Sequence, residues 1–327
     1  MNYDRFIQER EADWKELSNI LGKIRAGGIK KLSRDELSRL GKLYRTATSH
    51  LAAARTYFPS SDASRYLNHL VAQAHASIYR SQALNLKDII HLFSREIPAV
   101  FQRRIGYIAL AFALFAGASA VGFFGCYIEE DLPRIIVGDK YIDKTEENIA
   151  SGDPVAIYKT GFRPLASSII MTNNLGVTFY AFSLGILMGV GTVLILLFNG
   201  LMFGSIAFVF HQYSYSIEFL STVMIHGTIE LSCIFIAGGA GLLLGDALIN
   251  PGDHFRRDAL VRSGKEAVRL ILGIAPWLVL AGLIEGFITP MDLSLPARMA
   301  VIMVTGMLFV IYFGRIRRVS SASLRPF

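Results

Sequence analysis

The feature that most constrains this chain is the change at Ile105, where long apolar runs begin. The first, Ile105–Ile128, contains no charged residue, and a helix crosses a bilayer core with about 20 apolar residues. Charged residues make up only 18% of the chain, against about a quarter in an average soluble domain. A plain soluble or disordered chain is therefore excluded, and the pattern predicts an all-α, polytopic membrane bundle.

The apolar runs predict about six membrane spans, the second and third being separated by a polar break at Asn199–Gly200. They are Ile105–Ile128, Leu175–Phe198, Leu201–Tyr215, His226–Ile249, Val268–Phe287 and Pro296–Phe313. Six spans place both termini on one side of the membrane. Five spans, with Leu175–Tyr215 as one broken span, would place the segment 250–269 on the opposite side from the N-terminus.

The loop charges favour the six-span arrangement, because basic residues gather in cytoplasmic loops. In that arrangement three basic segments share one side: Arg103–Arg104, the loop 250–269 and the tail 314–327. The loop 129–174, with 8 acidic against 5 basic residues, falls on the other side. We therefore expect both termini in the cytoplasm and the loop outside, where it forms a surface amphipathic helix or packs on the span ends.

Residues 1–104 carry 18 basic and 10 acidic residues, with no run long enough to span a bilayer. They do not show the pattern of a secretory signal peptide, and we expect none. Helical patterns recur there: an apolar stripe in Asp13–Leu21, a helix after Ser33 with Glu36 completing a capping box, and a helix from Asp62. Another helix begins near Lys87. These patterns predict a cytoplasmic helical domain over 1–104, a membrane domain over 105–313 and a basic tail over 314–327. The positive charge suits a surface beside anionic lipid, and no nucleic-acid motif is visible.

His226-Gly227-Thr-Ile-Glu230 is the most informative motif, because ionisable residues at membrane depth are costly. His226 and Glu230 are four residues apart and share a helix face. The pair could lock helix packing through hydrogen bonds, form a proton or ion relay, or belong to a metal or catalytic site. Packing is the favoured interpretation. A metal site needs three or four ligands, and no recognisable spacing supplies them, so we expect no metal and no cofactor.

Two other kinds of residue stand out in the spans. Asn173, Asn174 and Asn199 could cap helices, hydrogen-bond across them or line a polar path, and capping is the favoured reading. Gly-x-x-x-Gly pairs allow close helix approach, more plausibly within one chain than at an oligomer face. The pairs are Gly185/Gly189, Gly200/Gly204, Gly241/Gly245 and Gly282/Gly286.

Hydrolase, zincin, nucleotide-binding and dinucleotide-binding signatures are absent from the sequence, so we expect no enzyme. The chain has only two cysteines, Cys126 and Cys233, and both lie in apolar runs. Their number excludes a disulfide scaffold, and we expect them to act as small packing residues.

An ordered set of residues from about Trp14 to Pro251 resembles the stage II sporulation protein M family. In the first part these are Trp14-x-x-Leu17, Leu37-x-x-Leu40, Leu43-Tyr44-Arg45, Leu51 and Ala54-Arg55. In the spans they are Asn173–Asn174, Phe182-x-x-Gly185-x-x-x-Gly189, Asn199-Gly200-x-x-x-Gly204, His226-Gly227-x-x-Glu230, Ala237–Gly241 and Pro251.

This resemblance implies a multi-span protein of the inner membrane without established catalysis. In endospore formers the namesake belongs to a complex that remodels peptidoglycan and helps to localise its hydrolases. We therefore expect a scaffold that organises membrane or envelope partner proteins, itself a homo-oligomer, with a dimer favoured. The alternative is a channel or secondary transporter that uses the polar residues near His226 and Glu230.

Overall fold

The computed structural model describes residues 2–28, 32–78, 85–156 and 164–314, with the side chains of the last range described from residue 173. All of these residues form helices or their connections, and no strand occurs among them. The chain divides into two compact units, the N-terminal unit Met1–Asn85 and the membrane unit Leu86–Phe327. The division lies earlier than the expected domain boundary at residue 104, because residues 86–104 pack with the membrane unit.

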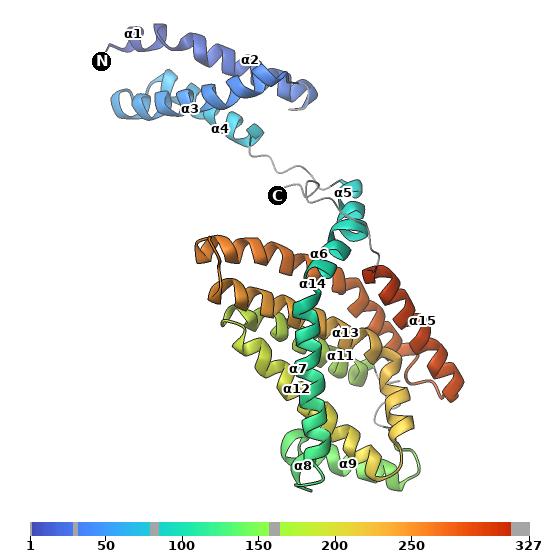
Figure 1. Ribbon diagram of the computed structural model, residues 1–327. Helices are drawn as coiled ribbons and strands as arrows, with labels where there is room; N and C mark the ends of the chain where they lie inside the picture. The colour runs from blue at the N-terminus through green and yellow to red at the C-terminus, as the bar shows by residue number, and fades with distance from the viewer. Residues whose placement is uncertain (1, 29–31, 79–84, 157–163, 315–327) are drawn as a thin grey trace. The chain divides into compact units, whose positions relative to one another are not determined.

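In the described part of the N-terminal unit the helices are α1 Tyr3–Gln8, α2 Glu11–Gly27, α3 Arg34–Tyr57 and α4 Asp62–Ile78 (Figure 1). Ser33 and Glu36 form the predicted capping box at the start of α3. The unit has its own hydrophobic core, in which Leu17 and Leu67 are fully buried. Leu37, in the first turns of α3, is 51% exposed and lies outside this core.

The membrane unit begins with three short segments and continues with the long helices of the bundle. The short segments are α5 Leu86–His91, the π-helical turn η2 Leu92–Glu96 and α6 Ile97–Arg103. The rest are α7 Ile105–Gly125, α8 Leu132–Val137, α9 Asp139–Ala150, α11 Pro164–Ser183, the 3-10 turn η4 Leu184–Ile186, α12 Val190–Gln212, α13 Ser216–Ile249, α14 Arg256–Phe287 and α15 Leu295–Gly314.

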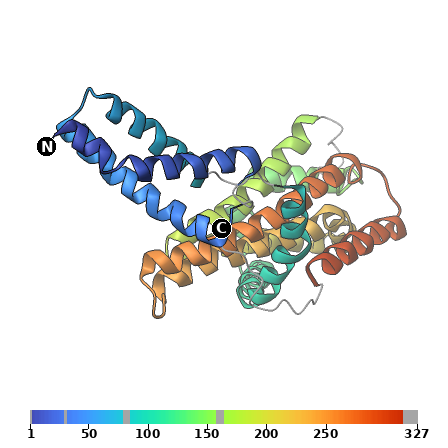
Figure 2. The same ribbon diagram turned by 90° about the horizontal axis from the view of Figure 1, so that it is seen from above.

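Five of these helices, α7, α12, α13, α14 and α15, are long and apolar enough to cross a membrane. Helix α11 has 20 residues but is not among the five, and it contains the polar pair Asn173–Asn174. Helix α13 lies at the centre, in contact with α7, α11, α12, α14 and α15, and α14 runs alongside it (Figure 2). The fold is therefore an all-α polytopic bundle.

Helix α6, which precedes the first long helix, and the last residues of α15 lie at the same end of the bundle. Gln102 donates a hydrogen bond to the carbonyl of Phe313 at 3.3 Å, and the rings of Phe101 and Phe313 lie 4.7 Å apart. Arg104 pairs with Glu266 at 2.6 Å at this same end, which we call the α6 end. Helices α8 and α9 lie at the opposite end, the α9 end (Figure 1).

The expected helix break at Asn199–Gly200 is wrong, because both residues lie inside α12. Asn199 donates its side-chain N–H to the carbonyl of Ile195, one turn earlier, so the amide is satisfied without interrupting the helix. The chain reverses instead at Met188 and Gly189, which both have positive φ. The second and third predicted spans therefore correspond to α11 and α12, with different bounds, and of these two only α12 is among the five helices long and apolar enough to cross a membrane.

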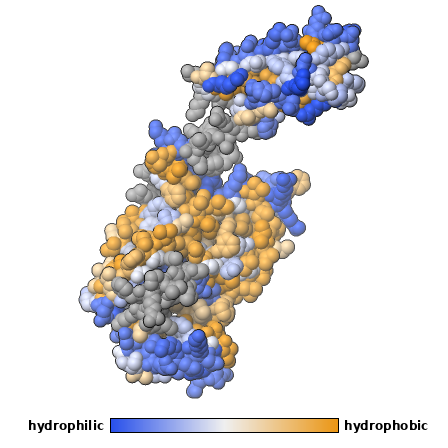
Figure 3. Space-filling model, turned by 180° about the vertical axis from the view of Figure 1, so that it is seen from behind, coloured by the Kyte–Doolittle hydropathy of each residue, from blue (hydrophilic) through white to orange (hydrophobic). Residues whose placement is uncertain are grey.

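Apolar side chains cover much of the face of the bundle that Figure 3 shows, and hydrophilic ones gather over α8 and α9. Exposed apolar side chains occur on all five of the long apolar helices. Burial within the protein is uneven among the spans. It reaches 67% of the most apolar stretch of α13 but only 17% of that of α15. An exposed apolar belt of this kind is what a lipid environment accepts and water does not.

The loop 129–174 is largely helical and packs on the bundle. Helix α8 contacts α12, and Val155 packs against Phe210 and Phe219 at the α9 end. Ile142 of α9 is 3% exposed. Within the described part of this loop, apolar residues thus pack on protein. Nearly all of the basic tail 314–327 lies outside the described residues.

Candidate functional site

Two ionisable side chains are buried on one face of the central helix α13. His226 and Glu230 are 5% and 4% exposed, and they lie one helical turn apart. Glu230 is 14 residues after the first residue of α13, or roughly 20 Å along the axis at about 1.5 Å per residue. This distance places the carboxyl group well inside the bundle rather than at its surface.

Each of these side chains bonds to a different neighbouring segment. The Nδ1 atom of His226 lies 3.0 Å from the hydroxyl oxygen of Thr289, just after α14. The Nδ2 atom of Asn174, in α11, donates to Oε2 of Glu230 at 2.6 Å. The motif His226–Glu230 thus joins α13 to α11 and to the end of α14, and no hydrogen bond within the pair itself accompanies these two.

A third ionisable side chain, Glu285 of α14, belongs to the same region. It is 6% exposed, and both of its carboxylate oxygens are buried without a hydrogen-bond partner. Buried polar groups nearly always have such a partner. A carboxyl group in this state is therefore a candidate for a functional role.

Arg298 joins α15, the last described helix, to the N-terminal part of α13. Its guanidinium donates to the hydroxyls of Ser221 and Thr222 at 3.3 and 2.9 Å and to the carbonyl of Leu293 at 2.9 Å. The guanidinium group of Arg298 thus bonds only to neutral acceptors in these three contacts, two of which join α15 to the first turns of α13.

Glycines bring the helix backbones together around this polar group. A Cβ atom at Gly241 would overlap the carbonyl oxygen of Ala181, and one at Gly185 would overlap that of Gly241. Gly200 and Gly204 meet the backbone of α7 at Phe115 and Ser119 in the same way. Gly245 meets Gly189. These contacts lie within one chain, whereas Gly286 faces open space.

The structure brings together only part of the predicted polar set. Asn174 is inside α11 and bonds across to Glu230, so it does not act as a cap. Asn173 is exposed, and Asn199 bonds within its own helix. Sequence reasoning did not place Glu285 or Thr289 in this set. A lone carboxylate inside an apolar run was the available signal for Glu285.

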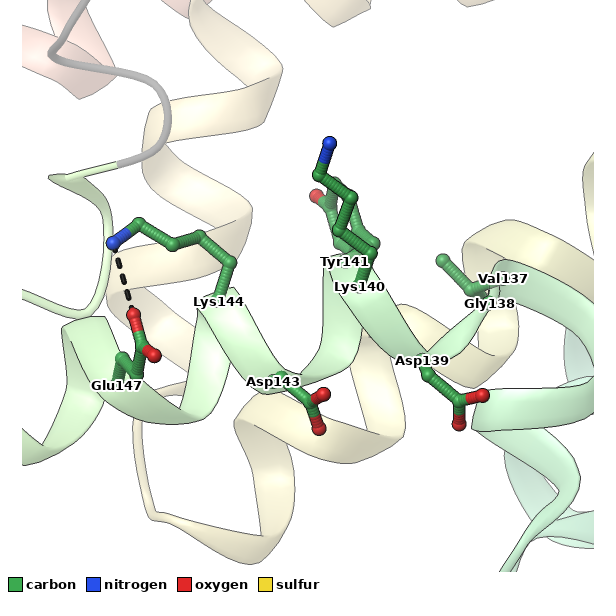
Figure 4. A pocket seen from close by; sticks show the side chains of 8 residues that line it. All are labelled: Val137, Gly138, Asp139, Lys140, Tyr141, Asp143, Lys144 and Glu147. Atoms are coloured by element: carbon green, nitrogen blue, oxygen red, sulfur yellow. Dashed lines mark hydrogen bonds and ion pairs between the residues drawn. The ribbon is translucent and has the colours of Figure 1, made fainter.

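The α9 end carries a separate, exposed charge cluster. Arg134 pairs with Asp143, Glu146 and Asp139, and hydrogen bonding to Asp143 raises the pKa of Arg134. An open hollow lies over residues 137–147, beside the Lys144–Glu147 pair (Figure 4). No group of three or more potential metal ligands occurs among the described residues. This surface cluster is distinct from the buried polar group.

Comparison with known proteins separates the two units. Residues 108–290 match the family model described as Stage II sporulation protein M, and residues 4–80 match one described as Domain of unknown function (DUF8413). The family match therefore begins after the N-terminal motifs that suggested it and extends past Pro251 into α14. No curated protein and no solved structure matches the chain. Because the first match covers more than half of it, the chain belongs to the Stage II sporulation protein M family of multi-pass membrane proteins.

Proposed function

We propose that this protein is a non-enzymatic scaffold that holds partner proteins at the inner membrane and the cell envelope. The observation that carries the proposal is the separate N-terminal unit, residues 1–85, which has its own hydrophobic core, while the membrane unit has another. A chain built in this way offers a water-facing docking surface on a membrane anchor. The surface formed by α8 and α9 offers a second one.

The proposal includes an orientation. Arg104 pairs with Glu266, so the basic segments 103–104 and 250–269 share the α6 end of the bundle. Basic residues near span ends are retained on the cytoplasmic side. We assign the α6 end and both termini to the cytoplasm, and α8 and α9 to the outside. Attachment of a single fluorescent reporter at each terminus, followed by accessibility to an impermeant quencher, tests this assignment.

A channel or secondary transporter is the second candidate. The observation in its favour is Glu285, whose buried carboxyl group lies in a span without a hydrogen-bond partner. Intramembrane ionisable residues commonly mark ion or proton pathways. Against this candidate, His226 and Glu230 are both engaged in hydrogen bonds that join helices, which is the geometry of a packed core.

The test of the scaffold is the composition of the particle extracted from native membranes in mild detergent. We expect partner proteins in fixed ratio with the wild-type chain. The double variant His226→Ala/Glu230→Ala should lose them if the polar group organises the assembly. Glu218→Gln, an exposed change on the same helix, is the matched control and should keep them. A partner-free homo-oligomer that conducts ions in liposomes would contradict the scaffold and support the second candidate.

A further inference from the structure

The helix register places Glu230 and Glu285 opposite each other. Helices α13 and α14 are joined by the short connection 250–255 and run antiparallel, and His226 meets Thr289 at 3.0 Å. One turn onward along α13 leads from His226 to Glu230, and one turn back along α14 leads from Thr289 to Glu285. The two carboxyl groups also lie within electrostatic range of each other.

The two carboxyl groups differ in their partners. Glu230 accepts one hydrogen bond, from Asn174 of α11, whereas neither oxygen of Glu285 has a partner. Both side chains are more than nine-tenths buried. A hydrogen bond from an amide N–H favours the ionised form of a carboxyl group, and a dry apolar setting favours the neutral form. The asymmetry therefore makes Glu285 a better place for a proton than Glu230.

No described positive charge compensates the pair. On α13 the nearby titratable groups are His226, bonded to Thr289, and Cys233. Helix α7 has no charged residue, and the described side chains of α11, from residue 173, include none either. The arginine of α15, Arg298, is engaged at Ser221 and Thr222. Among the described residues, no lysine or arginine bonds to either carboxyl group.

We propose that Glu230 and Glu285 form a proton-binding site, in which Glu285 carries a proton and Glu230 is the neighbouring carboxylate. Two facing carboxylates in a low-dielectric interior cannot both remain ionised, and one proton shared by the pair removes the repulsion. On release, the O–H bond of the Glu285 carboxylic acid breaks, its electron pair stays on the oxygen and the proton passes to water. The site then gains one negative charge.

The site does not depend on the scaffold proposal, because it concerns the charge state of the bundle and not its partners. A scaffold would gain a protonation-dependent packing contact from it, and a transporter would gain a coupling site. The test below is made on purified protein in lipid, so its outcome is separate from that of the particle composition.

The test is infrared spectroscopy of the full chain in lipid bilayers at pH 7. Exposed aspartates and glutamates are ionised there, so a C=O stretching band of a carboxylic acid reports a buried proton. We expect this band in the wild type and its loss in Glu285→Gln. It should persist, shifted in frequency, in Glu230→Gln. Glu218→Gln, an exposed change on α13, should leave it unchanged.

Because Gln is neutral and of the same shape as a protonated glutamate, Glu285→Gln should fold, which gel filtration in detergent checks. A wild-type spectrum without the band at pH 7 would overturn the proposal. A band that appears only when sodium and potassium are removed would also overturn it, in favour of a bound cation. A band unchanged in the double variant Glu230→Gln/Glu285→Gln would place the proton elsewhere and reject the site.

Discussion

The N-terminal unit and the membrane unit solve the packing problem in opposite ways. In the N-terminal unit, large apolar side chains such as Trp14 and Leu17 fill the centre and ion pairs such as Arg39–Glu16 lie outside. In the membrane unit, apolar side chains cover the outside, and the centre contains glycine contacts and the polar group around Glu230. The comparison shows how solvent decides which side chains hold helices together: water drives apolar burial, whereas lipid leaves close packing and hydrogen bonds.

The largest expected effect of a single change is in the N-terminal core. Leu17→Ala should lower the free energy of unfolding of this unit by about 2–5 kcal/mol, because it removes a fully buried side chain and leaves a cavity. Hydrogen exchange of residues 1–85 in the full chain measures it. Leu37→Ala, at an exposed position of α3, is the control and should stay within about 0.5 kcal/mol.

In the membrane unit, adding a methyl group rather than removing side-chain atoms should lower the stability. Gly204→Ala adds one methyl group where α12 meets the carbonyl of Ser119 in α7, so the two helices must separate. We expect a loss of about 1–3 kcal/mol, measured by thermal unfolding in detergent. Gly117→Ala, on α7, adds the same methyl group where nothing lies within 4 Å. If both variants lost the same stability, the close helix approach would not be what holds α7 to α12.

The polar contact at the centre should matter less than this packing. Asn174→Ala removes the donor to Glu230 and should cost about 0.5–2 kcal/mol, the range that double-mutant cycles and model peptides give for interhelical hydrogen bonds in membranes. Unfolding of the purified bundle in increasing denaturing detergent measures the loss. Asn173→Ala, at the exposed neighbouring position, should leave the midpoint unchanged. An equal loss in both would exclude the hydrogen bond as its cause.

The smallest effect is a pH dependence confined to the N-terminal unit. Burial, with the charge of Arg10 adding to it, lowers the pKa of His50, whose Nδ1 atom accepts a hydrogen bond from the Trp14 indole at 3.0 Å. The unfolded chain then binds the proton more readily. Stability should be complete above about pH 6.5 and decline as the pH falls through the folded-state value.

Denaturant unfolding at pH 7.5 and at pH 5.5 measures how the stability of the N-terminal unit changes with pH. Hydrogen exchange of residues 1–85 is the readout of unfolding. His50→Gln keeps a side-chain acceptor for the indole but does not titrate, so it should flatten the slope. Glu9 and Glu36 also have lowered pKa values, so they change the stability at a more acidic pH. The change between pH 7.5 and 5.5 is therefore assigned to His50. A slope unchanged by His50→Gln would assign the effect to another group.

Local signals predicted local structure well. The capping box of Ser33 and Glu36 starts α3 because both of its hydrogen bonds lie within one helical turn. The apolar runs predicted the long helices because lipid imposes a minimum length. The prediction of a helix break at Asn199 was wrong. A polar residue in an apolar run suggests the end of a span, and the hydrogen bond from Asn199 to the carbonyl of Ile195 cannot be seen in the sequence. The partnership of Glu230 with Asn174 and Glu285 depends on the packing of three helices, which no local pattern encodes.

The measurement that tests this account most directly is region-resolved hydrogen exchange of the full chain in lipid nanodiscs, comparing the wild type, Leu17→Ala and Gly204→Ala. A scaffold with a separately packed docking unit requires the two units to unfold independently. We predict that Leu17→Ala speeds exchange only within residues 1–85, and that Gly204→Ala does so only within α7 and the helices packed on it. Faster exchange in both units after either single change would contradict the account.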